Sequence, residues 1–373
     1  MTTQTPNQPL ASVLLTGSLG IIVVLTLAAL CILPFEQHFF TGWVGIAFMC
    51  ATPTQVILNL FWHNNLPKRI GDMPQPLKGI SLTLITVVAG AFFTLLLSTL
   101  VGQNYGDTPM FIQYTILTVV TVLWLIPIWH AWPFSLVSKN PIIIGLVTLF
   151  ATYVLAYIVW FIFFDYTALA HIPTPNGEIV HPLYHPEIDP KGLFDSWVAM
   201  TFAVTTAGVI VIHSLFDFWP INKLSMGRPQ PVRGLIGTVY VLLFALIVRW
   251  FFTDFMGMEQ VSYMIQVPVC MLFGAFLVNN MMQFSLFPNL KQPYRGFALL
   301  ACSIIAGLIM YRLYSYAAYL FVGHELISGP AGGWELELWI ATAMLGVTFP
   351  MVFLVSGFFD FWLLKKQSKT TAG

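Results

Sequence analysis

Long apolar segments alternate with short polar segments from one end of the chain to the other. Most apolar segments run for about 20 residues, the length that an α-helix needs to cross a hydrocarbon core about 30 Å thick. The pattern predicts ten spanning helices, at residues 11–33, 42–62, 77–101, 109–132, 142–165, 194–217, 233–254, 260–285, 296–321 and 337–363. We therefore expect an all-α integral membrane protein that forms one transmembrane domain over residues 1–373.

A short motif recurs at the start of the odd-numbered helices. Proline follows an amide residue there, and glycine follows in four of the five cases; the starts are Gln8-Pro9, Gln75-Pro76 with Gly79, Asn140-Pro141 with Gly145, Gln230-Pro231 with Gly234, and Gln292-Pro293 with Gly296. Proline suits a first helical turn, because its missing N–H breaks no hydrogen bond there. The motif marks every second helix and therefore suggests a repeated two-helix unit.

The even-numbered helices also end alike, in Trp or Phe close to a turn. Aromatic side chains at the end of a span are typical of the headgroup region of a bilayer. Together the two motifs predict five parallel hairpin repeats, near residues 8–67, 75–133, 140–220, 230–288 and 292–363. Parallel repeats of this kind can close into a ring around an axis along the membrane normal, or pack irregularly.

Composition supports the membrane interpretation, since 58% of the residues are hydrophobic and 8% are charged. A soluble domain has about a quarter of its residues charged. The net charge is zero, which gives no reason to expect a nucleic-acid partner. The four cysteines lie in predicted spans without C-x-x-C spacing, so they predict neither a disulfide framework nor a zinc site.

The basic residues predict the orientation. Twelve of the 15 lie in the loops after even helices and in the C-terminal tail: Lys68, Arg69, Lys78, Lys139, Lys223, Arg228, Arg233, Lys291, Arg295, Lys365, Lys366 and Lys369. Basic loops stay in the cytoplasm. We therefore expect both termini in the cytoplasm of a bacterium, a location in the inner membrane, and a periplasmic loop at residues 166–193. The first apolar segment is long enough to be a retained span.

Prolines and amides concentrate in the even helices. Pro53, Pro127, Pro268 and Pro350 interrupt four of them. The freed carbonyls and the polar side chains must find partners away from lipid, so we expect even helices inside the bundle and odd helices outside. The residues expected to line a shared solute path are Gln55, Asn59, His213, Gln266 and Asn279. The alternative interpretation is ordinary hydrogen bonding between helices, or a core histidine in the case of His213.

Two arginines, Arg249 and Arg312, fall within predicted spans, where ionisable groups are costly and often functional. They are further candidates for the path, where they would attract an anion. The structural alternatives are extension of the side chain to the headgroups, or pairing with Asp165 or Asp254.

The predicted periplasmic loop contains His171, His181 and His185 beside Glu187 and Asp189. Histidines and carboxylates of this kind can bind zinc or copper. The prolines in the loop prevent a helix that would align His181 with His185, so a solvated loop that packs over the bundle is the alternative.

Catalytic and nucleotide-binding signatures such as G-x-x-x-x-G-K-[ST] and H-E-x-x-H are absent from the sequence, which favours a protein that is not an enzyme. We therefore expect a permease for a small solute, with the bilayer and the solute as partners. The rival is a membrane subunit of a redox or metal-dependent complex that holds quinone, haem or metal through histidines such as His63 and His130. The sequence identifies neither a cofactor nor the other subunits of such a complex.

Overall fold

The computed structural model describes residues 10–174, 177–330 and 333–365. Within them, ten helical spans are long and apolar enough to cross a membrane. The first five spans are α1 (Leu10–Ile32); α2 (Gln37–Phe39), a π-helical segment (Phe40–Val44), α3 (Gly45–Val56) and a second π-helical segment (Ile57–Phe61); α5 (Leu77–Leu100); α6 (Pro109–Leu123) with a π-helical segment (Trp124–Ile128); and α7 (Pro141–Phe163).

Of the other five spans, the sixth and the ninth are continuous α-helices, and the seventh, eighth and tenth contain π-helical segments. The five are α8 (Ser196–Leu215); α10 (Gln230–Trp250) with a π-helical segment (Phe251–Phe255); α11 (Gln260–Met264), a π-helical segment (Ile265–Val269) and α12 (Cys270–Met281); α13 (Tyr294–Val322); and α14 (Glu335–Ala341), a π-helical segment (Thr342–Thr348), α15 (Phe349–Phe353) and a last π-helical segment (Leu354–Phe358). Two short helices, α4 (Lys68–Gly71) and α9 (Ile221–Leu224), lie between spans.

The ten predicted spans are confirmed, but several even spans end earlier than predicted. The fourth, eighth and tenth spans end at Ile128, Met281 and Phe358, not at 132, 285 and 363. The physical reason is a left-handed backbone turn after every even span. Each turn has two consecutive residues with positive φ: His63 and Asn64, His130 and Ala131, Asp217 and Phe218, Gln283 and Phe284, Asp360 and Phe361. Positive φ cannot continue a right-handed helix, so the aromatic motifs lie in the turn.

Several spans begin at capping residues that satisfy the free N–H groups of the first turn. Thr108 Oγ1 accepts a hydrogen bond from Phe111 N, and Pro109 occupies the first helical position of the fourth span. Asp195 caps the sixth span through Trp197 N and Val198 N. These caps fix where the spans enter the bundle.

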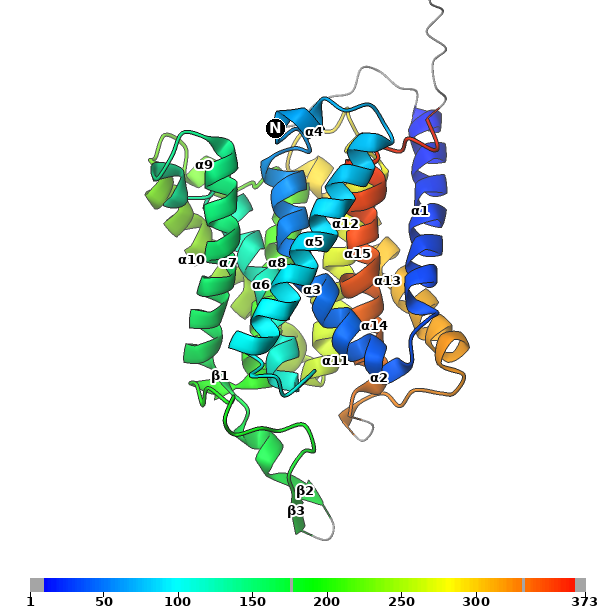
Figure 1. Cartoon of the computed structure of the whole chain (residues 1–373). Coiled ribbons are helices and arrows are strands. Elements are labelled where there is room, and N and C mark those ends of the chain that lie inside the picture. The colour runs from blue at the N-terminus through cyan, green and yellow to red at the C-terminus, as the bar shows by residue number, and fades with distance from the viewer. Residues whose placement is uncertain (1–9, 175–176, 331–332, 366–373) are drawn as a thin grey trace, which may run out of the picture.

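The two ends of the bundle differ. We name the end where α1 begins the terminal face, and the opposite end the hairpin face. Figure 1 shows α4 and α9 at the terminal face and the strands at the hairpin face. The strands are β1 (Phe164–Asp165), parallel to β4 (Phe194–Asp195), and β2 (Ile172–Thr174), antiparallel to β3 (Gly177–Ile179). The all-α expectation did not include these strands, which belong to the 166–193 loop and its edges.

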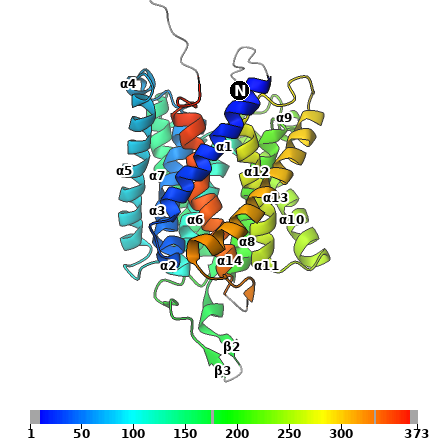
Figure 2. The same cartoon turned by 90° about the vertical axis from the view of Figure 1, so that its right-hand side faces the viewer.

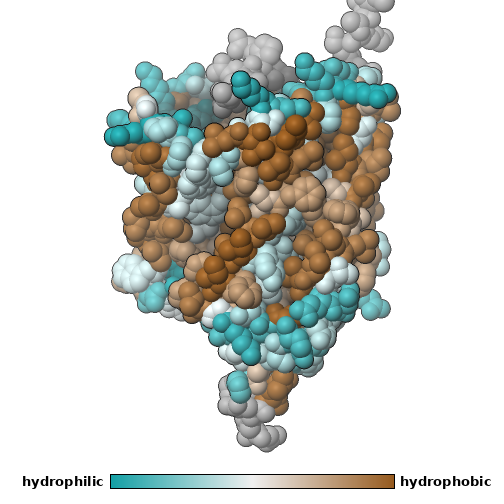
Figure 3. Space-filling view, turned by 60° about the vertical axis from the view of Figure 1, so that its left-hand side comes forward, coloured by the Kyte–Doolittle hydropathy of each residue, from teal (hydrophilic) through white to brown (hydrophobic). Residues whose placement is uncertain are grey.

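The even spans form the interior and the odd spans form the outside, as predicted. In the most apolar part of each span, 67–78% of the residues are buried in even spans and 17–33% in odd spans. Figures 1 and 2 show α1, α5, α7, α10 and α13 around the periphery. Their outward side chains are apolar and exposed, for example Leu15, Leu95, Val154, Ile247 and Ile305. Figure 3 shows the resulting apolar band, with hydrophilic residues at both ends.

The even spans follow one another around a common axis. α3 contacts α6, α6 contacts α8, α8 contacts α12, α12 contacts α15, and α15 contacts α3, which closes the circle. The closed inner layer therefore contains one span from each predicted hairpin. Gln8, Pro9, Lys366 and Lys369, which contributed to the motif and charge predictions, lie outside the described residues.

Candidate solute path

A small cavity of about 40 Å³ lies among the even spans. Every even span contributes to its wall, and all the side chains are apolar: Met49, Ile116, Val119, Val120, Leu123, Val204, Ala207, Leu272, Leu345 and Phe349. We call this site the axial cavity. An apolar cavity of this size gives water no hydrogen-bond partners and stays dry. The lining therefore offers neither water nor a polar solute a hydrogen bond at this level.

Phe349 is the largest side chain in this wall and is 2% exposed. Its ring packs edge-on against Phe276 of the eighth span, at 4.5 Å between ring centroids, and against Phe353 at 4.9 Å. Edge-to-face aromatic pairs contribute about 0.5–1.5 kcal/mol beyond their burial. The aromatic cluster holds Phe349 against the axis.

The ends of the even spans dock on the beginnings of odd spans through glycine. A Cβ added to Gly79, Gly145 or Gly234 would lie 2.5–2.6 Å from the ring of Phe359, Trp62 or Trp129, respectively. A Cβ on Gly296 would lie closer still to the ring of Phe216, and a Cβ on Gly17 would lie 2.7 Å from Met281 O and 2.9 Å from Met282 Sδ. In each case the bulky side chain immediately precedes the left-handed turn of an even span. These contacts join the second span to the fifth, the fourth to the seventh, the sixth to the ninth, the eighth to the first and the tenth to the third.

The glutamines of the Gln-Pro motif strengthen these contacts. Gln75 Nε2 donates to Phe358 O at 2.7 Å, Gln292 Nε2 to Leu215 O at 3.0 Å, and Gln230 Nε2 to Ile128 O at 3.3 Å. Each acceptor lies two residues before the first positive-φ residue of its span. Carbonyls at a helix end lack helical partners, so the motif glutamines satisfy them.

Gln55 and Asn59, predicted to line the path, both face the tenth span. Gln55 is 3% exposed, and its Nε2 donates to Pro350 O at 3.0 Å. Asn59 lies so close to Gly357 that a Cβ there would clash with Asn59 Nδ2. The structure therefore brings these two predicted residues together.

The other predicted path residues have other neighbours. His213 is buried, with Nδ1 2.7 Å from Val209 O, and its ring packs edge-on against Tyr240 and Phe244 of the seventh span. Gln266 Nε2 donates to Tyr311 OH of the ninth span at 3.3 Å. Asn279 is buried in the eighth span. None of the five lines the axial cavity, which is the site where the even spans meet.

The two arginines within spans differ in exposure. Arg312 is exposed on α13, as expected for a side chain that extends toward headgroups. Arg249 is half-buried, and its Nε has no hydrogen-bond partner among the described residues. The two acids proposed as partners have contacts of their own: Asp254 accepts from Thr253 Oγ1 and Asp165 from Thr167 N.

The loop histidines do not converge. His181 Nδ1 accepts a hydrogen bond from Leu183 N at 3.1 Å, and His185 stacks on Tyr105 at 4.2 Å between ring centroids. His171 is exposed at the surface of the loop. Within residues 10–174, 177–330 and 333–365, no group of three or more His, Cys, Asp and Glu side chains could hold a metal ion.

Asp189 is the centre of the same loop. Its Oδ1 accepts from Tyr166 N at 3.2 Å and from Lys191 N at 3.0 Å, and its Oδ2 accepts from Tyr184 OH at 3.0 Å. Burial and the hydrogen bond to Asp189 raise the pKa of Tyr184 to about 12, so this phenol remains a donor at neutral pH. Tyr166 OH in turn donates to Gln113 of the fourth span, which attaches the loop to the bundle.

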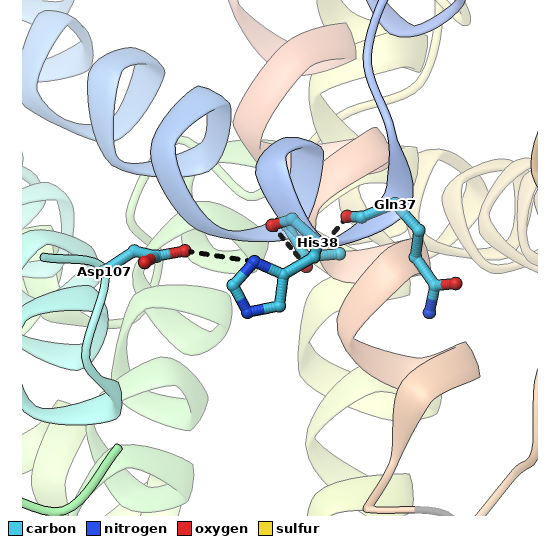
Figure 4. Close-up of polar contacts among 4 residues, drawn as sticks. Gln37, His38 and Asp107 are labelled. Atoms are coloured by element: carbon cyan, nitrogen blue, oxygen red, sulfur yellow. Dashed lines mark hydrogen bonds and ion pairs between the residues drawn. The ribbon is translucent and has the colours of Figure 1, made fainter. Parts of the chain in front are cut away.

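Sequence reasoning missed two further acids at the hairpin face. Asp107 Oδ2 lies 3.7 Å from His38 Nδ1, and the two side chains face each other in Figure 4. Asp107 is also pressed against Gly42, where a Cβ would collide with the carboxylate. Glu337, fully buried, accepts from Ser328 Oγ at 2.5 Å and Gly329 N at 3.3 Å. Single acids beside loops give no sequence motif, so only the packing reveals them.

Comparison with protein-family models, curated proteins and solved structures finds no match to this chain. The ten spans and the apolar composition define the class of the protein, a multi-pass helical membrane protein.

Proposed function

We propose that the protein is a permease that moves a small solute along the axis enclosed by the even spans. The observation that supports this function is the axial cavity. Side chains from all five even spans meet there, and all the residues of its wall belong to even spans. A closed apolar constriction is a known form of gate, since it excludes water until its wall moves. Four of the five even spans contain π-helical segments, which are frequent in the functional parts of helices.

The architecture that we propose for this path is a ring of five parallel copies of one hairpin. Glycine–bulky-residue contacts at the terminal face support it, because each joins an even span to the odd span two hairpins further around the circle. The five left-handed turns at equivalent places support it as well. By the distribution of basic residues, the terminal face is cytoplasmic and the hairpin face periplasmic, in a bacterial inner membrane.

The test of the function is flux into proteoliposomes that contain the purified protein. The probes are water, urea and glycerol, followed by light scattering, and K⁺ and Cl⁻, followed by conductance. We expect at least one probe to enter faster than it enters protein-free liposomes. Flux indistinguishable from protein-free liposomes for every probe would contradict the proposal. An absorbance spectrum and a metal analysis of the same sample serve as a control, because a Soret band or stoichiometric copper or iron would favour the redox-subunit alternative.

A further inference from the structure

Two amide side chains lie at the contact between the second and tenth spans, Gln55 just before the π-helical segment Ile57–Phe61 and Asn59 within it. Gln55 and Asn59 are four residues apart, so their side chains lie on one face of the helix, about 6 Å apart at Cβ. Pro350 and Gly357 are the contacts on the tenth span. These four residues define the niche. Localised π-helical turns are frequent at functional sites, because the extra residue redirects side chains.

Two polar atoms in the niche have no partner within the described residues: Gln55 Oε1, an acceptor, and Asn59 Nδ2, a donor. Asn64, which also lies beside Gly357, has an unpartnered acceptor of its own, Oδ1. Gln55 is 3% exposed, so its oxygen is not compensated by bulk water. A buried polar group without a hydrogen bond is destabilising, because nothing offsets the loss of its hydration. An orphan acceptor and an orphan donor one turn apart are arranged to be bridged by a molecule that can both donate and accept.

Gly357 provides the space in which Asn59 Nδ2 lies. A Cβ at this position would collide with that nitrogen and would also lie 3.2 Å from Asn64 Nδ2. Gly346, about three turns earlier on the same span, differs, because its added Cβ would find no atom closer than 3.4 Å. The requirement for glycine is therefore specific to the niche and not general to the tenth span.

We propose that this niche binds the transported solute, and that the solute is small, uncharged and able both to donate and to accept hydrogen bonds, as urea and simple alcohols do. The inference rests on the proposed permease function. The four residues of the niche carry no charge, so an ion would lose its hydration there without gaining a counter-charge. The axial cavity adds a second, apolar barrier to ions.

Asn59→Leu separates a binding role from a structural role. Asn59 Nδ2 forms no hydrogen bond within the described chain, so an apolar residue of similar size should leave the melting temperature unchanged or raised. If Asn59 binds solute, urea flux into proteoliposomes should nevertheless fall about tenfold, the loss expected for one hydrogen bond of about 1.4 kcal/mol. Gly357→Ala should reduce urea flux as well, whereas Gly346→Ala should leave it at the wild-type value.

The outcomes distinguish this inference from the function on which it rests. Wild-type flux of urea or glycerol, without K⁺ or Cl⁻ conductance, and its loss in Asn59→Leu and Gly357→Ala would support the niche. Wild-type flux that Asn59→Leu leaves unchanged would mean that the niche holds only water, and would overturn the inference while the permease remains. Ion conductance in the wild type would overturn it too. Absence of flux for every probe would overturn the function and the inference together.

Discussion

Gly79, in the first turn of the third span, lies against the ring of Phe359 at the end of the tenth span, where a Cβ on Gly79 would be 2.6 Å from a ring carbon. The two residues belong to the second and the last predicted hairpins, so this contact links distant parts of the chain. Gln75 reinforces it by donating to Phe358 O. The same pairing at four other places attaches the outer spans to the inner ones.

Gly79→Ala should lower the stability of the protein by about 1–3 kcal/mol, the usual cost of overpacking a close contact. The measurement is the melting temperature in detergent. The matched control is Gly346→Ala, which has room for a Cβ and gains helix propensity. Equal melting temperatures for the two variants would show that the contact does not hold the spans together.

The orientation is tested by labelling single cysteines from either side of the membrane. We expect labels from the cytoplasm at 68–76, 134–141, 221–230 and 289–293, and labels from the periplasm at 166–193 and 322–335. The reason is the concentration of basic residues on the first set of loops. A cysteine at residue 180 that reacts only from the cytoplasm would contradict this orientation.

The sequence predicted the ten spans because hydrocarbon restricts a spanning chain to helices. Pro53 and Gln55 in one span, and Pro268 and Gln266 in another, correctly placed the even spans inside. Span ends were less predictable. His130 and Ala131 adopt positive φ in the left-handed turn, although neither is a glycine, so the sequence does not mark the turn. The strands β1 to β4 were also missed, since two or three residues carry too little pattern.

Stability should decrease as the pH falls below about 6.5, the ordinary pKa of histidine. Burial, and then the guanidinium of Arg233, lower the pKa of His130, and burial lowers that of His181. A folded-state pKa below the unfolded value means that stability is full above the unfolded pKa and is lost as the pH falls toward the folded pKa. Melting temperatures between pH 7.5 and 5 should show this loss.

Arg233→Gln should make the loss smaller, because it removes the charge that repels protonated His130. Arg228→Gln on the same face is the control, and it should retain the wild-type pH profile. His130→Gln should remove the contribution of this residue entirely. A profile that is identical in the wild type and in His130→Gln would contradict the assignment.

Asp189→Asn should loosen the loop at residues 166–193. The carboxylate accepts three hydrogen bonds, and loss of one leaves a buried donor at a cost of about 1–3 kcal/mol. Limited proteolysis should therefore cut this loop faster in the variant. Glu187→Gln, at an exposed position of the same loop, is the control. Equal cleavage rates in the two variants would show that the hydrogen bonds to Asp189 do not stabilise the loop.

The candidate site was predictable only in part. Gln55 and Asn59 stand out in the sequence because amides are costly in lipid, and both lie in the niche. His213 and Gln266 gave the same signal but contact the seventh and ninth spans. The wall of the axial cavity gave no signal, because Val204, Ala207 or Leu272 resembles any other apolar residue of a span. The rotation of each helix about its own axis decides which apolar residues meet at the cavity. This rotation cannot be read from a single sequence.

The central claim is that solute moves along the axis, and the most direct test changes the axial cavity in both directions. We would measure urea and glycerol flux into proteoliposomes for Leu272→Ala, which enlarges the cavity, and for Ala207→Leu, which fills it. Ala151→Leu, on the lipid-facing groove of α7, is the matched control. The account predicts faster flux in Leu272→Ala, at least about tenfold slower flux in Ala207→Leu, and wild-type flux in Ala151→Leu. Wild-type flux in both axial variants, with both folded, would show that the solute does not pass between the even spans.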